Sequence, residues 1–239
     1  MTLDGKRIVV LGGSSGIGLA VAQAASREGA RIVIASKNRG RVDAALKTLP
    51  AGSEGLTADL SNEAAIQALF GGVGGFDHLV YTAGENLQLA NLDKLDLDWA
   101  RGFFGIRYWG ALTAAKHGAP HIAPNGSITF TSGLASQRPH AGWSVASSIC
   151  GAMEGLTRAL AVELAPVRVN IVRPGVVKSP LWDAMPDADR TALYARMADT
   201  LLLKHVGEPE EVAESYLYLM KQTYGTGQVV GVDGGGALV

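Results

Sequence analysis

The sequence predicts an α/β domain built on a doubly wound parallel sheet of about seven strands, with helices on both faces. Short apolar runs alternate with longer amphipathic segments along the whole chain, which is the pattern of repeated βαβ units. The chain has 239 residues, of which 47% are hydrophobic, so one sizeable core can form. No linker, repeat or low-complexity segment divides it. We therefore expect a single domain over residues 1–239.

A glycine-rich turn joins the first predicted strand, 7–11, to an alanine-rich helix, 19–28. Glycine permits positive φ, lets a phosphate approach the backbone, and allows the helix to pack closely on the strand. The helix N-terminus adds free N–H donors and the positive end of a dipole. A second strand at 31–35 completes the βαβ unit that such a nucleotide site requires, so we predict a Rossmann-type fold. The predicted phosphate-binding residues are Gly12, Ser14, Ser15, Gly16, Ile17 and Gly18.

The end of the second strand indicates which nicotinamide cofactor is bound. An acidic residue there would bind a ribose 2′-hydroxyl, whereas basic residues accommodate a 2′-phosphate. The segment Ser36-Lys37-Asn38-Arg39 has two cations and no acid. A solvated turn with incidental charge is the alternative. We predict NADP(H), bound by these four residues.

The remaining elements follow the same alternation. Strands are predicted at 55–58, 77–81, 127–131, 167–171 and 228–232, and helices at 39–49, 61–70, about 97–119, about 144–164 and from 209 onward. Ligands of parallel sheets bind beyond the carboxyl ends of the strands. The strand ends expected to meet in one crevice are Gly12, Ser36, Asp59, Ala83, Ser132 and Pro174-Gly175.

Composition and charge indicate which partners and locations to expect. A formal net charge of −1 gives no reason to expect a nucleic-acid partner. No apolar run is long enough to span a membrane, and residues 1–6 lack a signal-peptide pattern. The one cysteine, Cys150, excludes an internal disulfide and fits a reducing cytosol, so we expect a cytoplasmic protein. The histidines show no metal-ligand spacing, and no metal site is predicted.

Taken together, the motifs resemble those of the short-chain dehydrogenase/reductase family over essentially the whole chain. The matching pieces are Gly12-x-x-x-Gly16-x-Gly18, Asp59-Leu60, Ala83-Gly84, Arg168-Val169-Asn170, Pro174-Gly175, Gly207-x-Pro209-Glu210-Glu211-Val212, Gly227 and Val232-Asp233-Gly234-Gly235. The resemblance implies that Asp59 and Leu60 hold the adenine and that Ala83 and Gly84 line the cofactor. It implies that the segment 174–179, with Pro174, Gly175, Val177 and Ser179, touches the nicotinamide. It also implies a homotetramer or homodimer built on the two long helices and the C-terminal strand.

The same resemblance draws attention to the catalytic positions. The family uses Asn, Ser, Tyr and Lys, with the Tyr four residues before the Lys on the second long helix. Residues 153–160 fix the register of that helix, so the Tyr falls on Ala146 and the Lys on Cys150. The family's Asn falls on Arg107, and its Ser falls on Gly133, next to Ser132. The expected protein is thus an atypical member that keeps the cofactor half of the site and lacks the usual acid–base pair.

Three side chains are candidates to fill that gap. Arg107 would stabilise an oxyanion or bind a substrate carboxylate, with a structural ion pair as the alternative. Ser132 stands at a strand end where it can hydrogen-bond a substrate. His140 lies in the loop before the second long helix, and histidine suits proton transfer near neutral pH. Tyr81 and Tyr108 are further proton donors to consider, although core packing explains both.

Two functions remain open at this point. The first is an NADP(H)-dependent oxidoreductase with a non-standard proton route, acting on a carbonyl, an enone, or an imine or iminium. A substrate that is already cationic needs only a hydride. The alternative is a non-catalytic NADP(H)-binding protein that acts as a sensor or scaffold, or a non-redox enzyme. A lid at about 179–204 mixes apolar and charged residues, which predicts a moderately hydrophobic small-molecule substrate.

Overall fold

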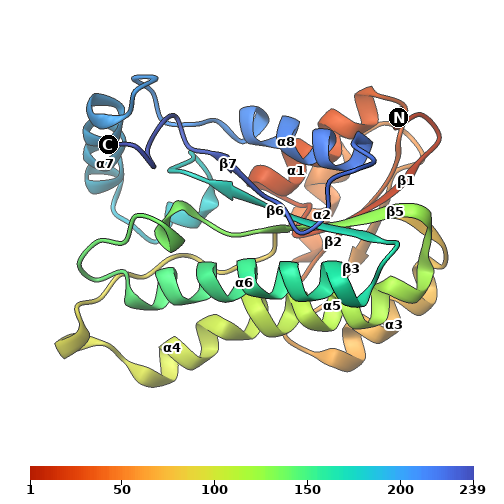
Figure 1. Cartoon of the computed structure of the whole chain (residues 1–239), viewed down its shortest axis with the longest axis horizontal. Helices are drawn as coiled ribbons and strands as arrows, with labels where there is room; N and C mark the ends of the chain where they lie inside the picture. Colours follow the sequence, from red (N-terminus) through yellow and green to blue (C-terminus); the bar gives the residue numbers. More distant parts are fainter.

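The computed structural model describes residues 1–239 and contains one seven-stranded sheet (Figure 1). The strands are β1 (Arg7–Leu11), β2 (Arg31–Ser36), β3 (Glu54–Thr57), β4 (Phe76–Tyr81), β5 (Ile122–Thr131), β6 (Arg168–Pro174) and β7 (Val229–Val232). They lie in the order β3-β2-β1-β4-β5-β6-β7, and every neighbouring pair is parallel. The predicted fold class is confirmed. The strand order reverses direction between β1 and β4, which is where such sheets open a ligand crevice.

Helices cover both faces of the sheet, as Figure 1 shows. They are α1 (Gly16–Arg27), α2 (Arg39–Leu46), α3 (Glu63–Val73), α4 (Leu97–Phe104), α5 (Ala111–Gly118), α6 (Ser144–Glu163), α7 (Asp187–Thr200) and α8 (Pro209–Lys221). One core cluster joins one sheet face to α1, α2 and α8, and a second joins the other face to α3, α5 and α6. None of the helices has the length and apolar character needed to cross a bilayer.

The first predicted long helix, 97–119, is interrupted in the structure. A π-helical turn over Gly105–Gly110 separates α4 from α5. The Tyr81 hydroxyl donates a hydrogen bond to the Ile106 carbonyl in this turn at 2.5 Å. Glycine is required at position 110, because a Cβ there would overlap the same hydroxyl. The turn is therefore accompanied by contacts with a distant segment, which helical periodicity along the sequence does not reveal. Such π-helical turns recur at functional sites.

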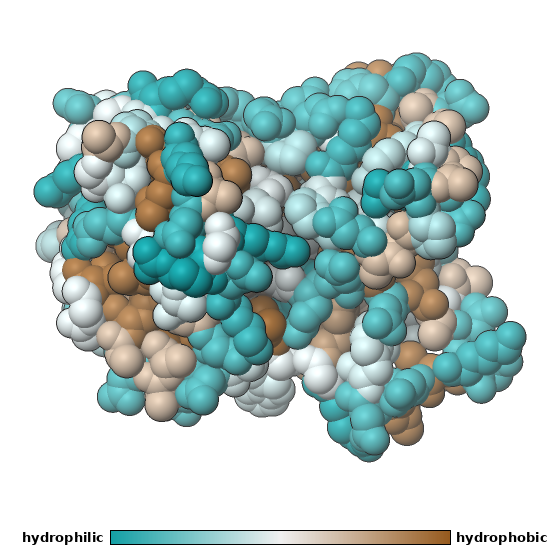
Figure 2. All heavy atoms as spheres, turned by 180° about the vertical axis from the view of Figure 1, so that it is seen from behind, coloured by the Kyte–Doolittle hydropathy of each residue, from teal (hydrophilic) through white to brown (hydrophobic).

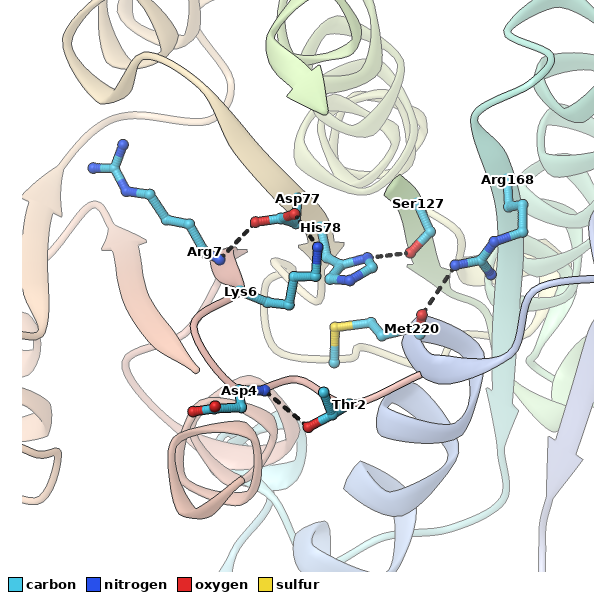
Figure 3. Close-up of polar contacts among 9 residues, drawn as sticks. All are labelled: Thr2, Asp4, Lys6, Arg7, Asp77, His78, Ser127, Arg168 and Met220. Carbon is cyan, nitrogen blue, oxygen red and sulfur yellow. Dashed lines mark hydrogen bonds and ion pairs between the residues drawn. The ribbon is translucent and has the colours of Figure 1, made fainter. Parts of the chain in front are cut away.

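A polar cluster lies toward the amino-terminal ends of the strands (Figure 3). We call Asp77, His78, Ser127 and Arg168 the amino-edge cluster; the last three are paired across β4, β5 and β6. Asp77 accepts hydrogen bonds from the Lys6 ammonium and the Arg7 backbone N–H, both at 2.9 Å. The Nδ1 atom of His78 and the Ser127 hydroxyl are 2.9 Å apart. These hydrogen bonds lie toward the amino-terminal ends of the strands, opposite the crevice at their carboxyl ends.

Arg168 and His78 show how this cluster accommodates buried polar groups. The Arg168 guanidinium donates to the Leu219 and Met220 carbonyls, at 2.6 and 3.0 Å, and so satisfies the C-terminus of α8. His78 is 3% exposed. Burial lowers its pKa from 6.5 to about 4, because the charged imidazolium would lose its hydration. His78 is therefore neutral at physiological pH.

Candidate functional site

A cleft of about 590 Å³ opens at the carboxyl ends of β1, β2, β4, β5 and β6. Seen from behind, the molecule shows a hollow between two lobes, bordered mainly by hydrophilic and intermediate residues (Figure 2). Seventeen predicted cofactor residues line the cleft: Gly12, Ser14, Ser15, Gly16, Ile17, Gly18, Ser36, Lys37, Asn38, Asp59, Leu60, Ala83, Gly84, Pro174, Gly175, Val177 and Ser179. The structure therefore brings the predicted strand ends together as the topology requires.

The glycine turn shapes the middle of the cleft. Gly12 has φ of 88°, and a Cβ there would lie 2.6 Å from the Ala83 backbone nitrogen. A side chain at Gly18 would overlap the Gly12 carbonyl oxygen. Ser15 precedes α1 in extended conformation, and no side chain caps the helix. The first N–H groups of α1 therefore remain available to an anionic ligand in the cleft.

One end of the cleft, after β2, is basic. Lys37 forms an ion pair with Asp59 at 2.8 Å, and its side chain is 74% exposed. Hydrogen bonds from Lys37 and from Ser61 lower the pKa of Asp59 to about 2. Arg39 does not line the cleft, and its guanidinium instead pairs with Asp43 on α2 at 2.8 Å. The cofactor role of Arg39 stays a prediction, and the structure gives it no support.

Arg41 lines this basic end and was missed by the sequence analysis. The Asn38 side chain caps α2 by accepting a hydrogen bond from the Arg41 backbone N–H at 2.9 Å. This cap places Arg41 in the first helical turn, beside the strand end. Recognising Asn38 as an N-cap was the available signal, because the cap fixes which residues of the first turn face back toward the strand.

The other end of the cleft contains Arg107. Its guanidinium packs on Gly84, where a Cβ would lie 2.5 Å from Arg107 Cζ, and it donates to the Glu85 carbonyl. The Phe103 ring centroid is 4.6 Å from the same Cζ. Burial lowers the pKa of Arg107, and burial raises that of Glu85 while the nearby Arg107 charge opposes the rise. The Arg107 Nε atom is buried and has no hydrogen-bond partner.

Ser132 also lines this end, and its hydroxyl has an unexpected partner. It donates to Glu154 Oε1 at 3.2 Å, and Ser136 donates to the same oxygen at 2.6 Å. Arg173 Nη1 lies 3.7 Å from that oxygen. The sequence analysis missed Glu154, although it follows Cys150 by one helical turn and so shares its face of α6.

The other sequence candidates lie outside the cleft. His140 is exposed in its loop and stacks edge-to-face on Trp143, with ring centroids 5.1 Å apart. Ala146 is buried on α6, and burial raises the pKa of the Cys150 thiol to about 11. Tyr81 is buried against the π-helical turn, and desolvation raises its pKa. The catalytic assignment of His140 therefore stays a prediction without a contact to support it.

Part of the predicted lid contributes to the cleft. Ser179, Pro180 and Leu181 line it, and the Leu87 backbone N–H donates to the Leu181 carbonyl at 3.1 Å. Trp182 is buried, and its indole N–H donates to the Val177 carbonyl at 3.0 Å. Helix α7 contributes no lining residue. A lid that extends over 179–204 stays a prediction.

Comparison with known proteins identifies the family. A family model described as Enoyl-(Acyl carrier protein) reductase matches residues 12–236. Short-chain dehydrogenase/reductase ATR9 of Stachybotrys chlorohalonatus is 39% identical, and the alignment covers 99% of each chain. This chain belongs to the short-chain dehydrogenase/reductase family. MalC Reductase/Diels-Alderase from Malbranchea aurantiaca has a TM-score of 0.89 at 33% identity, over 98% of this chain and 96% of that one. A small-chain dehydrogenase crystallised with NADPH has a TM-score of 0.84 at 34% identity, over 99% and 100% of the two chains.

The cleft of this short-chain dehydrogenase/reductase has the chemistry that a phosphorylated dinucleotide requires. Uncapped N–H groups of α1 face its middle, and a Cβ at Gly12 or Gly18 would close the turn that exposes them. Lys37 and Arg41 supply positive charge after β2, on the side where the adenosine half lies in such sheets. The opposite half of the cleft is lined by Arg107 and Ser132.

Proposed function

We propose that this protein is an NADP(H)-dependent oxidoreductase that reduces a small, moderately hydrophobic molecule by a non-standard proton route. The observation that carries the proposal is the continuous cleft, which runs from Lys37 past the N-terminus of α1 to Ser132 and Arg107. A similar protein has been crystallised with NADPH, which supports the choice of cofactor. When bound, NADPH supplies the hydride.

Different residues along the cleft bind different parts of the cofactor. Lys37 and Arg41 bind the 2′-phosphate, and the N–H groups of α1 bind the pyrophosphate. Asp59 and Leu60 hold the adenine. Pro174, at the end of β6, and Gly175, Val177 and Ser179 after it would contact the nicotinamide. Leu181 and Pro180 add apolar surface that excludes water above the reactive end.

Ser132 determines which kind of substrate group fits. A hydroxyl has one O–H donor, and Ser132 uses it in the hydrogen bond to the Glu154 carboxylate. Its lone pairs then face the cleft, where they accept a hydrogen bond from the substrate. Since Ala146 and Cys150 provide no Tyr–Lys pair, we propose an electrophile that brings its own proton, such as a protonated imine. Hydride adds to the imine carbon, the C=N π electrons return to nitrogen, and the product is an amine without further proton transfer.

This proposal is tested by following NADPH absorbance with 3,4-dihydroisoquinoline, a cyclic imine, and with a ketone and an enone, 1-tetralone and 2-cyclohexenone. We expect turnover of the protonated imine. Ser132→Ala should lower that rate about 5- to 10-fold, the value of one hydrogen bond. The matched control is Ser136→Ala, because Ser136 bonds the same Glu154 oxygen and does not line the cleft. A faster ketone than imine reaction would contradict the proposed proton route.

A non-catalytic protein that binds NADP(H) as a sensor or scaffold, or a non-redox enzyme, is the second candidate. The small side chains of Ala146 and Cys150, at the positions expected for Tyr and Lys, favour it. If NADPH binds but none of the three acceptors is reduced, this second function is favoured over the oxidoreductase.

We also propose that the chain forms a homodimer or homotetramer in the cytoplasm. Exposed apolar side chains on α4, the π-helical turn and α6 support an assembly through the long helices: Leu97 is 60% exposed, Trp109 59% and Val162 82%. The single free cysteine is compatible with a reducing compartment. Light scattering of wild type and Trp109→Glu tests the assembly, and a monomeric wild type would contradict it.

A further inference from the structure

We propose that Arg107 binds the nicotinamide ribose of NADP(H), so that the cation at this point of the site comes from the π-helical turn and not from α6. The inference rests on the proposed NADP(H) binding. It gives Arg107 a cofactor-binding role, whereas the sequence analysis considered only an oxyanion, a substrate carboxylate or a structural ion pair.

Arg107 lies in the half of the cleft away from β2. A dinucleotide spans the point where strand order reverses, with its adenosine half on the β2 side. Arg107 lies beyond that point, on the β4–β5–β6 side. Its guanidinium packs on Gly84, which follows β4, and it shares the cleft lining with Thr131 and Ser132. Arg107 thus faces the half that receives the nicotinamide nucleoside.

Arg107 leaves most of its hydrogen-bond donors unused within the protein. A guanidinium has five N–H donors, and Arg107 makes one hydrogen bond, to the Glu85 carbonyl. The Phe103 ring covers part of the group. Arg107 lines the cleft, so the guanidinium N–H groups on that side are free to donate to acceptor oxygens of a ligand. Ribose hydroxyls are such acceptors and carry no charge of their own.

The π-helical turn that contains Arg107 contacts α6, which contains Cys150. Burial raises the pKa of the Cys150 thiol, and the Arg107 charge opposes that rise. The family resemblance expects a lysine at position 150. The Tyr81 hydroxyl bound to the Ile106 carbonyl fixes the adjacent backbone.

Isothermal titration with two ligands tests the inference without requiring a substrate. NADPH contains the nicotinamide ribose, whereas 2′,5′-ADP contains only the adenosine half. We expect Arg107→Met to weaken NADPH about 10- to 100-fold and to leave 2′,5′-ADP unchanged. Arg107→Lys should weaken NADPH less, because the charge is kept and the fork geometry is lost. Arg41→Met is the matched control and should weaken both ligands alike.

A double variant, Arg107→Met with Cys150→Lys, adds a rescue. It should recover most of the NADPH affinity, since the cation returns from α6. Equal weakening of both ligands by Arg107→Met, or unchanged NADPH affinity, would overturn the inference. If Arg107→Met does not fold, the titration of Arg107→Lys tests the inference instead. An unchanged NADPH affinity in Arg107→Lys would then overturn it. If wild type binds both ligands and the Arg107 variants bind them equally well, the inference fails and the proposed function stands. If wild type binds neither ligand, the inference and the proposed function both fail.

Discussion

Polar side chains have different roles at the amino-terminal ends of the strands, here called the amino or closed edge, and at their carboxyl ends, the carboxyl or open edge. At the amino edge, Asp77, His78, Ser127 and Arg168 hydrogen-bond to other protein groups (Figure 3). At the carboxyl ends of the strands, the first N–H groups of α1 have no side-chain cap, and Arg41 and Arg107 line the open cleft. The same strands therefore begin among polar groups paired with one another and end at an open cleft. The closed edge holds the fold together, and the open edge keeps donors available for a ligand.

The largest expected effect comes from filling the glycine turn at the open edge. Gly18→Val would drive a side chain into the Gly12 carbonyl and Thr82, so we expect NADPH binding to fall more than about 100-fold and stability to fall by roughly 1–3 kcal/mol. Gly102→Ala is the matched control, because a Cβ there meets nothing within 4 Å and alanine favours the helix. Calorimetric binding and thermal unfolding measure both effects. Equal behaviour of the two variants would contradict the assigned turn.

The closed edge predicts a specific pH dependence of stability. Unfolded His78 takes up a proton near pH 6.5 and folded His78 only near pH 4. The unfolded state therefore binds more protons in this window, and the free energy of unfolding falls as pH is lowered through it, by roughly 3 kcal/mol in total. His78→Asn keeps a polar side chain and removes the titration, so urea unfolding between pH 7 and pH 4 should show a smaller slope. An identical slope in both proteins would refute the burial argument.

Selection of the 2′-phosphate is the next effect in size. Lys37→Met removes a cation from the basic end of the cleft, so NADPH should bind about 10- to 50-fold more weakly, while NADH, which lacks the phosphate, changes little. Titration of both cofactors against both proteins gives the selectivity ratio. A parallel loss for NADH would mean that Lys37 acts through Asp59 or the fold and not through the phosphate.

The smallest effect separates two neighbouring arginines. Arg39 pairs with Asp43 on an exposed helix surface, so Arg39→Ala should change stability by less than about 0.5 kcal/mol and leave NADPH affinity within about twofold. Arg41 lines the cleft, and Arg41→Ala should weaken NADPH several-fold more than Arg39→Ala does. The reverse order would restore the role that the sequence analysis gave to Arg39.

The fold, and the meeting of the predicted strand ends in one cleft, could be predicted because they depend on local patterns. The alternation of apolar strands and amphipathic helices determines a parallel sheet, and a parallel sheet brings its carboxyl ends together. That is why Ser36, Asp59, Ala83 and Pro174 line one cleft although they are far apart in sequence. The turn at Gly12 needed only its flanking strand and helix to be recognised.

The reactive end could not be predicted because its geometry depends on contacts between distant segments. The π-helical turn that presents Arg107 is accompanied by a hydrogen bond from Tyr81, 25 residues earlier than its partner Ile106. Glu154, on a separate element, accepts the hydrogen bond from Ser132, and the Asn38 cap of α2 places Arg41 beside the cleft. A residue alignment shows which side chains stand at each position, whereas these contacts decide where they point.

One measurement tests the central claim, that the open edge is an NADP(H) site, most directly. The folded protein is titrated with NADPH and with NADH, and binding is followed by fluorescence. The account predicts tight, saturable binding with a clear preference for NADPH, lost in Gly18→Val and retained in Gly102→Ala. Failure of the wild-type protein to bind either cofactor, with cooperative thermal unfolding intact, would contradict it.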